Sequence, residues 1–218
     1  MPKTKSKNVV DKAGSQRTTS AYLAQCRVKA LSESATVQVP PTSDEVSGLI
    51  SWLKSKGLKP LIVGSVGVLS YLSVDPSFGF RPTVDVDIWL DKMPNELPSG
   101  WKIDRESVGV PSWVSQSGGH VDFLLPNQDL PSGRTPARIE PNPDTLDTDF
   151  PVASWQSLLK LKLNSYREKD LADSIALVRA VGRVPSAKEL KGLNATQADN
   201  LRMVKLWLEL RPSGKYGE

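Results

Sequence analysis

The sequence predicts a mixed α/β protein, in which a small mixed sheet is flanked by helices and followed by a C-terminal helical region. Short apolar runs with strand-like alternation, such as TVDVDIWL (83–90), are separated by Pro- and Gly-rich loops up to about residue 150. From there on, the apolar residues recur at helical spacing. We therefore expect a basic, partly flexible N-terminal arm over 1–40, an α/β core over 41–150 and a helical region over 151–218.

Composition limits the possible functions. With 218 residues, 39% of them apolar and 24% charged, the chain is long enough for one good core. The net charge of +4 permits an RNA or nucleotide partner without requiring one. Cys26 and His120 are the only residues of their kinds, which excludes an internal disulfide, a Cys-based zinc site and histidine-rich metal sites. No apolar run reaches the roughly 18 residues of a membrane span, so we expect a cytoplasmic protein without membrane contact.

The elements of the core follow from local signals. Thr42 or Ser43 can cap a helix over 42–57, and Gly57 can end it. An apolar run ending at Gly64 predicts a buried strand. The remaining expected elements are helices over 21–31 and 65–74, strands over 83–90, 101–106 and 121–126, weaker strands over 137–140 and 151–154, and helices from 154 to the C-terminus.

Three acidic residues carry the strongest functional signal. Asp85 and Asp87 lie two residues apart on one expected strand, so both side chains leave the same face. Asp122, on another expected strand, can add a third carboxylate. Carboxylates about 6–7 Å apart repel one another without a cation. Mg²⁺ (or Mn²⁺) would resolve that repulsion and would bind substrate phosphates, and two such ions can serve phosphoryl transfer. The alternative is a solvated strand face with Asp122 as an isolated surface acid.

Gly64 and Ser65 mark the point where the buried strand turns into a helix. Glycine allows a phosphate to approach the backbone closely, and a helix N-terminus offers N–H donors to it. The signal is weak alone, but it gains specificity from the acids that follow. Helix capping by Ser65 without substrate contact is the alternative.

The helical region supplies cations that can bind a triphosphate, namely Lys162, Arg167 and Lys169. An unbroken helix would place Lys162 and Asp173 on one face. Alternatively, Asp170 could open a second helix after a turn at YREK. We favour a functional role for Lys162 and a solvated position for the other two cations.

Two further residues have open interpretations. Arg81 precedes the acidic strand and either holds a loop of the site, reaches a phosphate or is a plain surface arginine. His120 follows Gly118-Gly119 and precedes Asp122 by two positions, and we expect a hydrogen-bonded loop histidine there rather than a general base.

Taken together, these motifs resemble the nucleotidyltransferase superfamily, in particular the branch of AbiEii-type and MenT-type toxins. The stretches that carry the resemblance are Gly64-Ser65, RPTVDVD (81–87), VDFLLP (121–126) and PVASWQSLLKLKLNSYREKDLADSIAL (151–177). Their common order and spacing are more specific than any single motif. The resemblance implies metal ligands at Asp85, Asp87 and Asp122, NTP contacts at Ser65 and Lys162, and a supporting active-site acid at Asp170.

The expected activity is therefore Mg²⁺-dependent transfer of NMP from an NTP to an RNA (tRNA) or protein hydroxyl. The resemblance also implies a toxin of a toxin–antitoxin or phage-defence system, with an antitoxin protein as a partner. A small-molecule acceptor such as an aminoglycoside is the alternative enzyme reading. A non-catalytic nucleotide-binding, virion or interaction module on the same fold is the other alternative, and the intact acids argue against it.

Overall fold

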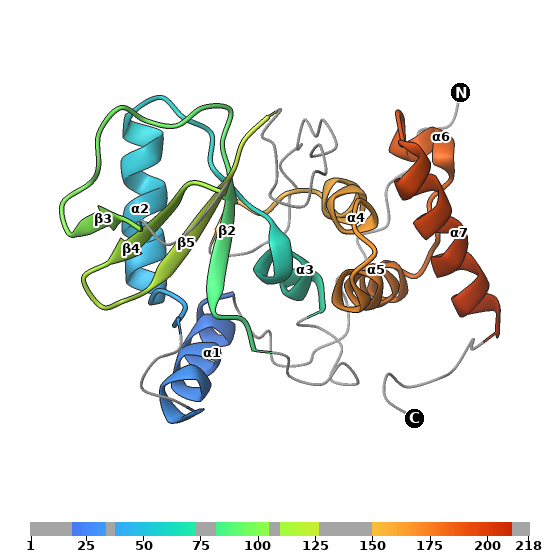
Figure 1. Cartoon of the computed structure of the whole chain (residues 1–218), viewed down its shortest axis with the longest axis horizontal. Helices are drawn as coiled ribbons and strands as arrows, with labels where there is room; N and C mark the ends of the chain where they lie inside the picture. The colour runs from blue at the N-terminus through green and yellow to red at the C-terminus, as the bar shows by residue number, and fades with distance from the viewer. Residues whose placement is uncertain (1–18, 34–37, 73–81, 105–109, 127–149, 211–218) are drawn as a thin grey trace, which may run out of the picture.

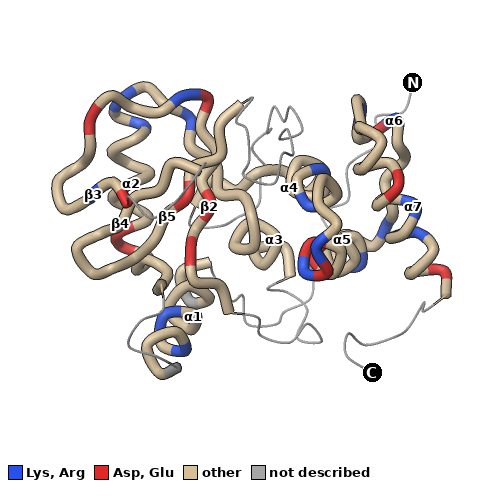
Figure 2. Tube along the Cα trace, in the orientation of Figure 1, with Lys and Arg blue, Asp and Glu red and all other residues tan. Residues whose placement is uncertain are grey.

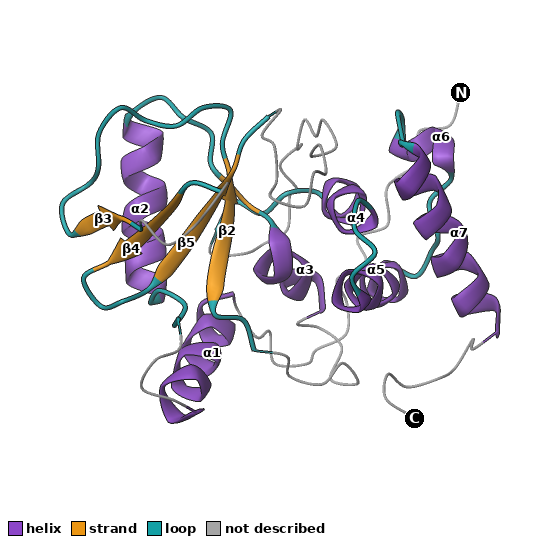
Figure 3. Cartoon of the chain, in the orientation of Figure 1, coloured by secondary structure: helices purple, strands orange, loops and turns teal. Residues whose placement is uncertain are grey.

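The expected mixed α/β fold is confirmed by a computed structural model of the chain (Figures 1 and 3). The structure describes residues 19–33, 38–72, 82–104, 110–126 and 150–210. The helices are α1 (Thr19–Glu33), α2 (Ser43–Ser55), α3 (Gly64–Leu72), α4 (Trp155–Leu163), α5 (Glu168–Val181), α6 (Ala187–Leu190) and α7 (Ala195–Leu210). The strands are β1 (Leu61–Ile62), β2 (Asp85–Trp89), β3 (Trp101–Ile103), β4 (Ser112–Ser115) and β5 (His120–Leu124).

The five strands form one mixed sheet in the order β1-β2-β5-β4-β3. β2 and β5 lie side by side and run parallel, while the other neighbouring strands pair antiparallel. In the register of the parallel pair, Asp85 lies opposite His120 and Asp87 lies opposite Asp122. Because facing residues of neighbouring strands point to the same side of a sheet, this register places all four side chains on one face.

The opposite face of the sheet holds the core. Val86 and Ile88 of β2 and Phe123 of β5 are fully buried there. An edge-to-face aromatic chain with ring centroids 4.6 Å and 6.2 Å apart runs from Phe123 through Trp113 to Trp52 of α2. α2 therefore packs on the apolar face. One apolar cluster extends from Tyr22 of α1 to Val204 of α7, so the N-terminal helix and the C-terminal helices share this core.

Local signals explain how α2 begins. Thr42 is its N-cap, and the Thr42 hydroxyl and the Glu45 carboxylate form a reciprocal capping box. Gly57, which follows the helix, has a φ of 75°, a value that glycine adopts without strain. Of the two expected caps, the structure uses Thr42.

Three features differ from the sequence-based expectations. β4 was not expected, because SWVS is a short run in which serines flank the apolar residues. The helical stretch after residue 154 is broken between Leu163 and Glu168, so the unbroken-helix alternative is wrong and a second helix does begin near Asp170. The weak strand expected over 151–154 is reduced to a single bridge between Val152 and Ile62.

Some expectations are not tested by the described residues. The strand expected over 137–140 lies outside them, as do residues 1–18 and 34–37 of the arm expected over 1–40, of which Thr19–Glu33 forms α1. The proposed boundaries at residues 40 and 150 stay predictions. No helix in the described part of the chain has both the length and the apolar character needed to cross a membrane.

Candidate active site

Strand pairing creates a row of polar side chains across the sheet. Asp87 of β2 faces Asp122 of β5, and Asp122 in turn faces Ser112 of β4. Asp85 belongs to the same face, two residues before Asp87. Asp85, Asp87 and Asp122 are all half-buried, so the acids cluster on one partly accessible face as the alternation predicted. Figure 2 shows these acidic positions on β2 and β5.

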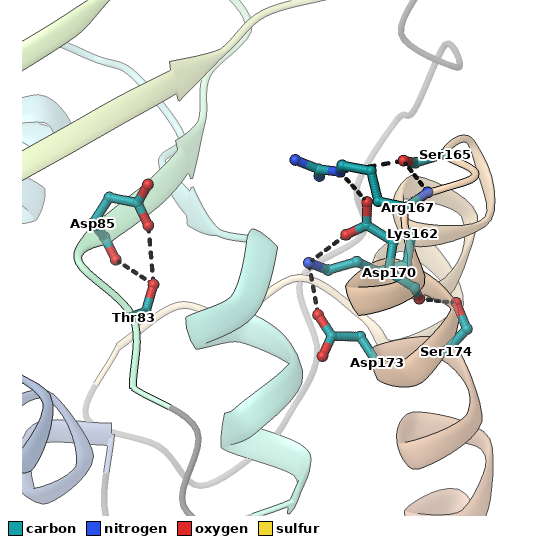
Figure 4. Close-up of polar contacts among 8 residues, drawn as sticks. All are labelled: Thr83, Asp85, Lys162, Ser165, Arg167, Asp170, Asp173 and Ser174. Atoms are coloured by element: carbon teal, nitrogen blue, oxygen red, sulfur yellow. Dashed lines mark hydrogen bonds and ion pairs between the residues drawn. The ribbon is translucent and has the colours of Figure 1, made fainter.

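Asp85 is oriented by the residue that precedes the strand. The Thr83 hydroxyl donates to the Asp85 carboxylate at 2.9 Å and lies 3.2 Å from the Asp85 carbonyl oxygen (Figure 4). Thr83 is itself buried, and its backbone N–H donates to the Cys26 sulfur of α1 at 3.4 Å. Packing between α1 and the start of β2 thus holds the first acid in place.

Asp87 lies against the start of α3. The Val63 N–H donates to the Asp87 carbonyl at 2.9 Å, which brings the next residue, Gly64, beside the Asp87 side chain. A Cβ atom at position 64 would overlap the Asp87 carboxylate, and Gly64 has a φ of 61°. Glycine is therefore required here for space as well as for backbone conformation. Ser65 follows Gly64 in the first turn of α3 and is half-buried.

The electrostatics of the face favour a bound cation. Burial raises the pKa of Asp87 to about 7, with a further increase from Asp85 and Asp122 that Lys162 and Lys169 only partly oppose. Burial, Asp85 and Asp104 raise the pKa of Asp122 to about 6. Asp85 thus makes ionisation of both Asp87 and Asp122 harder, which is the situation that a divalent ion relieves.

The donor set fits Mg²⁺ or Mn²⁺, which prefer carboxylate oxygens. As the side chains stand, however, no three His, Cys, Asp or Glu residues in the described ranges are arranged around one ion position. Metal binding at Asp85, Asp87 and Asp122 therefore stays a prediction, supported by residue type and by mutual repulsion.

Lys162 of α4 belongs to a buried ion-pair network with acids of α5 (Figure 4). Its Nζ lies 3.2 Å from the Asp170 carboxylate and 2.8 Å from that of Asp173. The Arg167 Nε contacts the other Asp170 oxygen at 2.6 Å. Burial opposes ionisation of Asp170, but Lys162 and Arg167 lower its pKa below the ordinary value. The structure thus gathers Lys162, Arg167 and Asp170, and it adds Asp173 to them.

Asp104 is a site residue that our sequence analysis missed. It follows β3, and its backbone N–H donates to the Ser112 carbonyl at 2.9 Å, which continues the row of side chains beyond Asp122. Its carboxylate lies 3.3 Å from His120 Nδ1. His120 is thus the first residue of β5 and not a loop histidine, although it does have a polar partner. The alternation of Lys102 and Asp104 around Ile103 was the available signal, but the strand lies at the sheet edge and is only three residues long.

The structure leaves some residues outside this arrangement. Arg81 lies outside the described residues. Lys160, two residues before Lys162, donates instead to the Lys191 carbonyl at 2.9 Å. An open hollow of about 460 Å³ lies between the α5–α6 connection and α7, and its lining includes Pro185 and Leu208 but none of the three acids.

Comparisons with known proteins are limited. No protein-family model matches the chain, and no curated protein is significantly similar to it. An antigenic nucleotidyltransferase-like protein from Paracoccidioides brasiliensis has 22% identity, covers 80% of this chain and 92% of its own, and has a TM-score of 0.47. The antibiotic-resistance factor ANT(2'')-Ia has 10% identity, covers 77% of this chain and 91% of its own, and has a TM-score of 0.42. Both TM-scores lie below 0.5, so the case for a function depends on the residues of this chain.

Proposed function

We propose that the protein is a metal-dependent nucleotidyltransferase that moves NMP from an NTP to a hydroxyl acceptor. The observation that carries the proposal is the parallel β2–β5 register, which sets Asp87 beside Asp122 on the same face as Asp85. Lys162 lies close enough to this face to lower the pKa of Asp87. Carboxylates, a glycine-lined helix start and a buried ammonium are the groups that binding a metal-complexed triphosphate requires.

Each group of residues would have its own role in the reaction. Asp85, Asp87 and Asp122 would hold Mg²⁺ or Mn²⁺, which when bound offsets phosphate charge and polarises the reacting oxygens. Gly64 and Ser65 would receive phosphate oxygens at the start of α3. In the reaction, the acceptor oxygen bonds to the α-phosphorus while the bond to pyrophosphate breaks, and the hydroxyl proton passes to a carboxylate of the face. The Lys162 ammonium would stabilise the charge that grows on the departing pyrophosphate.

The nature of the acceptor is a finer proposal. The sequence resemblance supports an RNA (tRNA) or protein hydroxyl, and with it a toxin that an antitoxin protein neutralises. The basic balance of the chain, with a net charge of +4, is compatible with RNA. Arg81 would contact the NTP from the segment before β2, and Asp170 would support Lys162 through their 3.2 Å contact.

A small cationic acceptor is a second candidate, and one observation favours it. Asp104 adds a fourth carboxylate next to Asp122, on the β4–β3 side of the face and away from the network of Lys162. An acceptor that carries amines would find complementary charge there. An RNA backbone would meet repulsion at the same place.

One labelling experiment tests the activity and separates the acceptors. The protein is incubated with each α-³²P-labelled NTP, Mg²⁺ and either total RNA, total protein or an aminoglycoside mixture. We expect label in one acceptor class, and loss of that label on chelation with EDTA. Absence of label in every class, with an NTP-binding protein confirmed to be folded, would reject the enzyme and favour a non-catalytic nucleotide-binding module.

A further inference from the structure

We infer that Asp173 is a positioning residue, which fixes the Lys162 ammonium at the point where it meets the phosphates of a bound NTP. The inference rests on the proposed function for the role of Lys162. It goes further by giving Asp173 a separate task from Asp170, and by predicting that this task governs turnover rather than affinity for NTP.

Lys162 and both of its acidic partners are buried. Lys162 is 7% exposed, Asp170 1% and Asp173 4%. A lysine side chain has many rotamers, and a buried ammonium has to be paired with acceptors. Two carboxylates from consecutive turns of α5 approach the same nitrogen, at 3.2 Å and 2.8 Å. Together they select one conformation of a side chain that would otherwise be mobile.

Asp170 and Asp173 differ in how they contact Lys162. Asp170 divides its carboxylate between Lys162 and the largely exposed Arg167, whose side chain is 59% accessible. Asp173 lies one turn further into α5 and approaches the ammonium more closely than Asp170 does. Asp170 thus shares its charge between Lys162 and the exposed Arg167, whereas the Asp173 carboxylate lies nearer to the ammonium.

The Lys162 ammonium keeps donor capacity beyond its two acids. It has three N–H donors and donates a hydrogen bond to Asp170, while its contact with Asp173 is an ion pair without hydrogen-bond geometry, so at least one donor remains for a further partner. Lys162 lowers the pKa of Asp87, which places the ammonium within electrostatic range of the acid face. In Figure 4 the network projects from α4 and α5 toward the strand that carries Asp85. The remaining donor is therefore available on the side where a triphosphate would lie.

Kinetics of Asp173→Asn test the inference. The substitution keeps the shape of the side chain, and Lys162 keeps Asp170 as a partner. We expect kcat per folded enzyme to fall roughly 10- to 100-fold, the scale found for residues that orient a functional group. The KM for NTP should fall or stay constant, because a negative charge beside the ammonium has been removed. A merely structural role would reduce the fraction of protein that binds NTP, with the kcat of the bound fraction unchanged.

Equilibrium binding of a non-hydrolysable ATP analogue provides a readout without turnover. Lys162→Met should weaken binding about tenfold or more, while Asp173→Asn should not weaken it. The kcat of the double variant Lys162→Met/Asp173→Asn should equal that of Lys162→Met, because the influence of Asp173 passes through Lys162. Additive losses, or an unchanged kcat in Asp173→Asn, would overturn the inference.

The control and the fallback use residues of the same chain. Asp199→Asn removes an exposed acid of α7 that pairs with Arg202, and it should leave kcat, KM and binding unchanged. If Asp173→Asn does not fold, Asp173→Glu keeps the charge but moves the carboxylate, and it must also lower kcat without raising KM. A wild-type protein that binds NTP but transfers no NMP would reject the proposed activity, whereas a wild type that transfers NMP, together with an unchanged kcat in Asp173→Asn, would reject only the role of Asp173. A wild-type protein that binds no NTP would reject both.

Discussion

The carboxylates of the candidate site form two groups, half-buried on the sheet and buried on α5, and their acidities are shifted in opposite directions. On the sheet, burial and neighbouring acids raise the pKa of Asp87 to about 7 and that of Asp122 to about 6. On α5, burial acts in the same sense, but Lys162 and Arg167 lower the pKa of Asp170 below its ordinary value. The residue type is the same and burial acts in the same sense on both groups, so the cations make the difference.

The two groups differ in charge balance: cations of the protein balance the carboxylates on α5 but not those on the sheet face. Lys162 and Arg167 balance Asp170 and Asp173 within the protein. On the sheet, Lys162 and Lys169 act on Asp87 from a distance, yet a net excess of negative charge remains on the face. A group of acids that the protein itself leaves unbalanced is suited to an external cation. The helix network is suited to hold a cation of the protein in place.

The largest expected effect is loss of transfer on removal of an acid from the sheet face. Asp87→Asn and Asp85→Asn should each reduce NMP transfer on the order of 10³-fold or more, the scale seen when one member of a catalytic group is removed. Circular dichroism should show an intact fold, because removal of one of several repelling acids does not weaken the apo protein. Full activity in both variants would reject the metal-site proposal.

A smaller loss is expected when the protein's own cation is removed. Lys162→Ala should cost about 2.7–4 kcal/mol in transition-state stabilisation, by analogy with loss of one preorganised donor. Lys162→Arg should recover part of this, because a planar guanidinium does not replace a compact ammonium. Turnover and NTP affinity are measured side by side for both variants.

Lys160→Ala is the matched control for that comparison. Lys160 is on the same helix, but its ammonium donates to the Lys191 carbonyl and is not part of the network. Alanine there should leave turnover unchanged. Equal and small losses at Lys160 and Lys162 would show that the triphosphate is held elsewhere.

Stability should distinguish the two groups of acids directly. Asp170→Asn should lower the free energy of unfolding by about 3 kcal/mol, because it breaks a buried ion pair of Lys162. Asp87→Asn, measured by the same urea titration at pH 8, should instead leave it unchanged or raise it. Destabilisation of similar size in both variants would remove the contrast between a balanced and an unbalanced group.

The smallest expected effect is the pH dependence of the free energy of unfolding. The folded-state pKa values of Asp87 and Asp122, about 7 and about 6, lie above the ordinary range. Their protonated forms therefore stabilise the apo protein fully below about pH 4, and this contribution is lost as pH rises through 6 and 7. The free energy of unfolding of Asp87→Asn minus that of the wild type should increase by more than about 1 kcal/mol from pH 5 to pH 8. Thermal unfolding of both proteins at the two pH values measures it.

Mg²⁺ provides the complementary measurement. Ionised carboxylates bind the ion and protonated ones do not, so Mg²⁺ should raise the melting temperature of the wild type more at pH 8 than at pH 5. The increase should be much smaller in Asp87→Asn. A rise that is equal in both proteins would indicate binding away from the sheet face.

The sequence by itself determined the local part of this arrangement. Alternation around Asp85 and Asp87 fixes their common face, because side chains two residues apart on a strand must point the same way. The strand around Asp122 and the helix start at Gly64 could be predicted on the same local grounds. Short-range periodicity and turn chemistry carry such information within a few residues of chain.

Only the tertiary structure decided which of these elements meet. Nothing local specifies that β5 pairs with β2 in the register that sets Asp122 beside Asp87, or that Asp104 extends the row from the edge strand. The break in the helical stretch before α5 likewise depends on a tertiary contact. The Asn200 side chain of α7 donates to the Leu163 and Ser165 carbonyls at 2.8 Å and 2.9 Å, and it thereby satisfies the backbone that a longer helix would have used. The partner that stabilises this break lies more than thirty residues away in the chain, so no window of local sequence could reveal it.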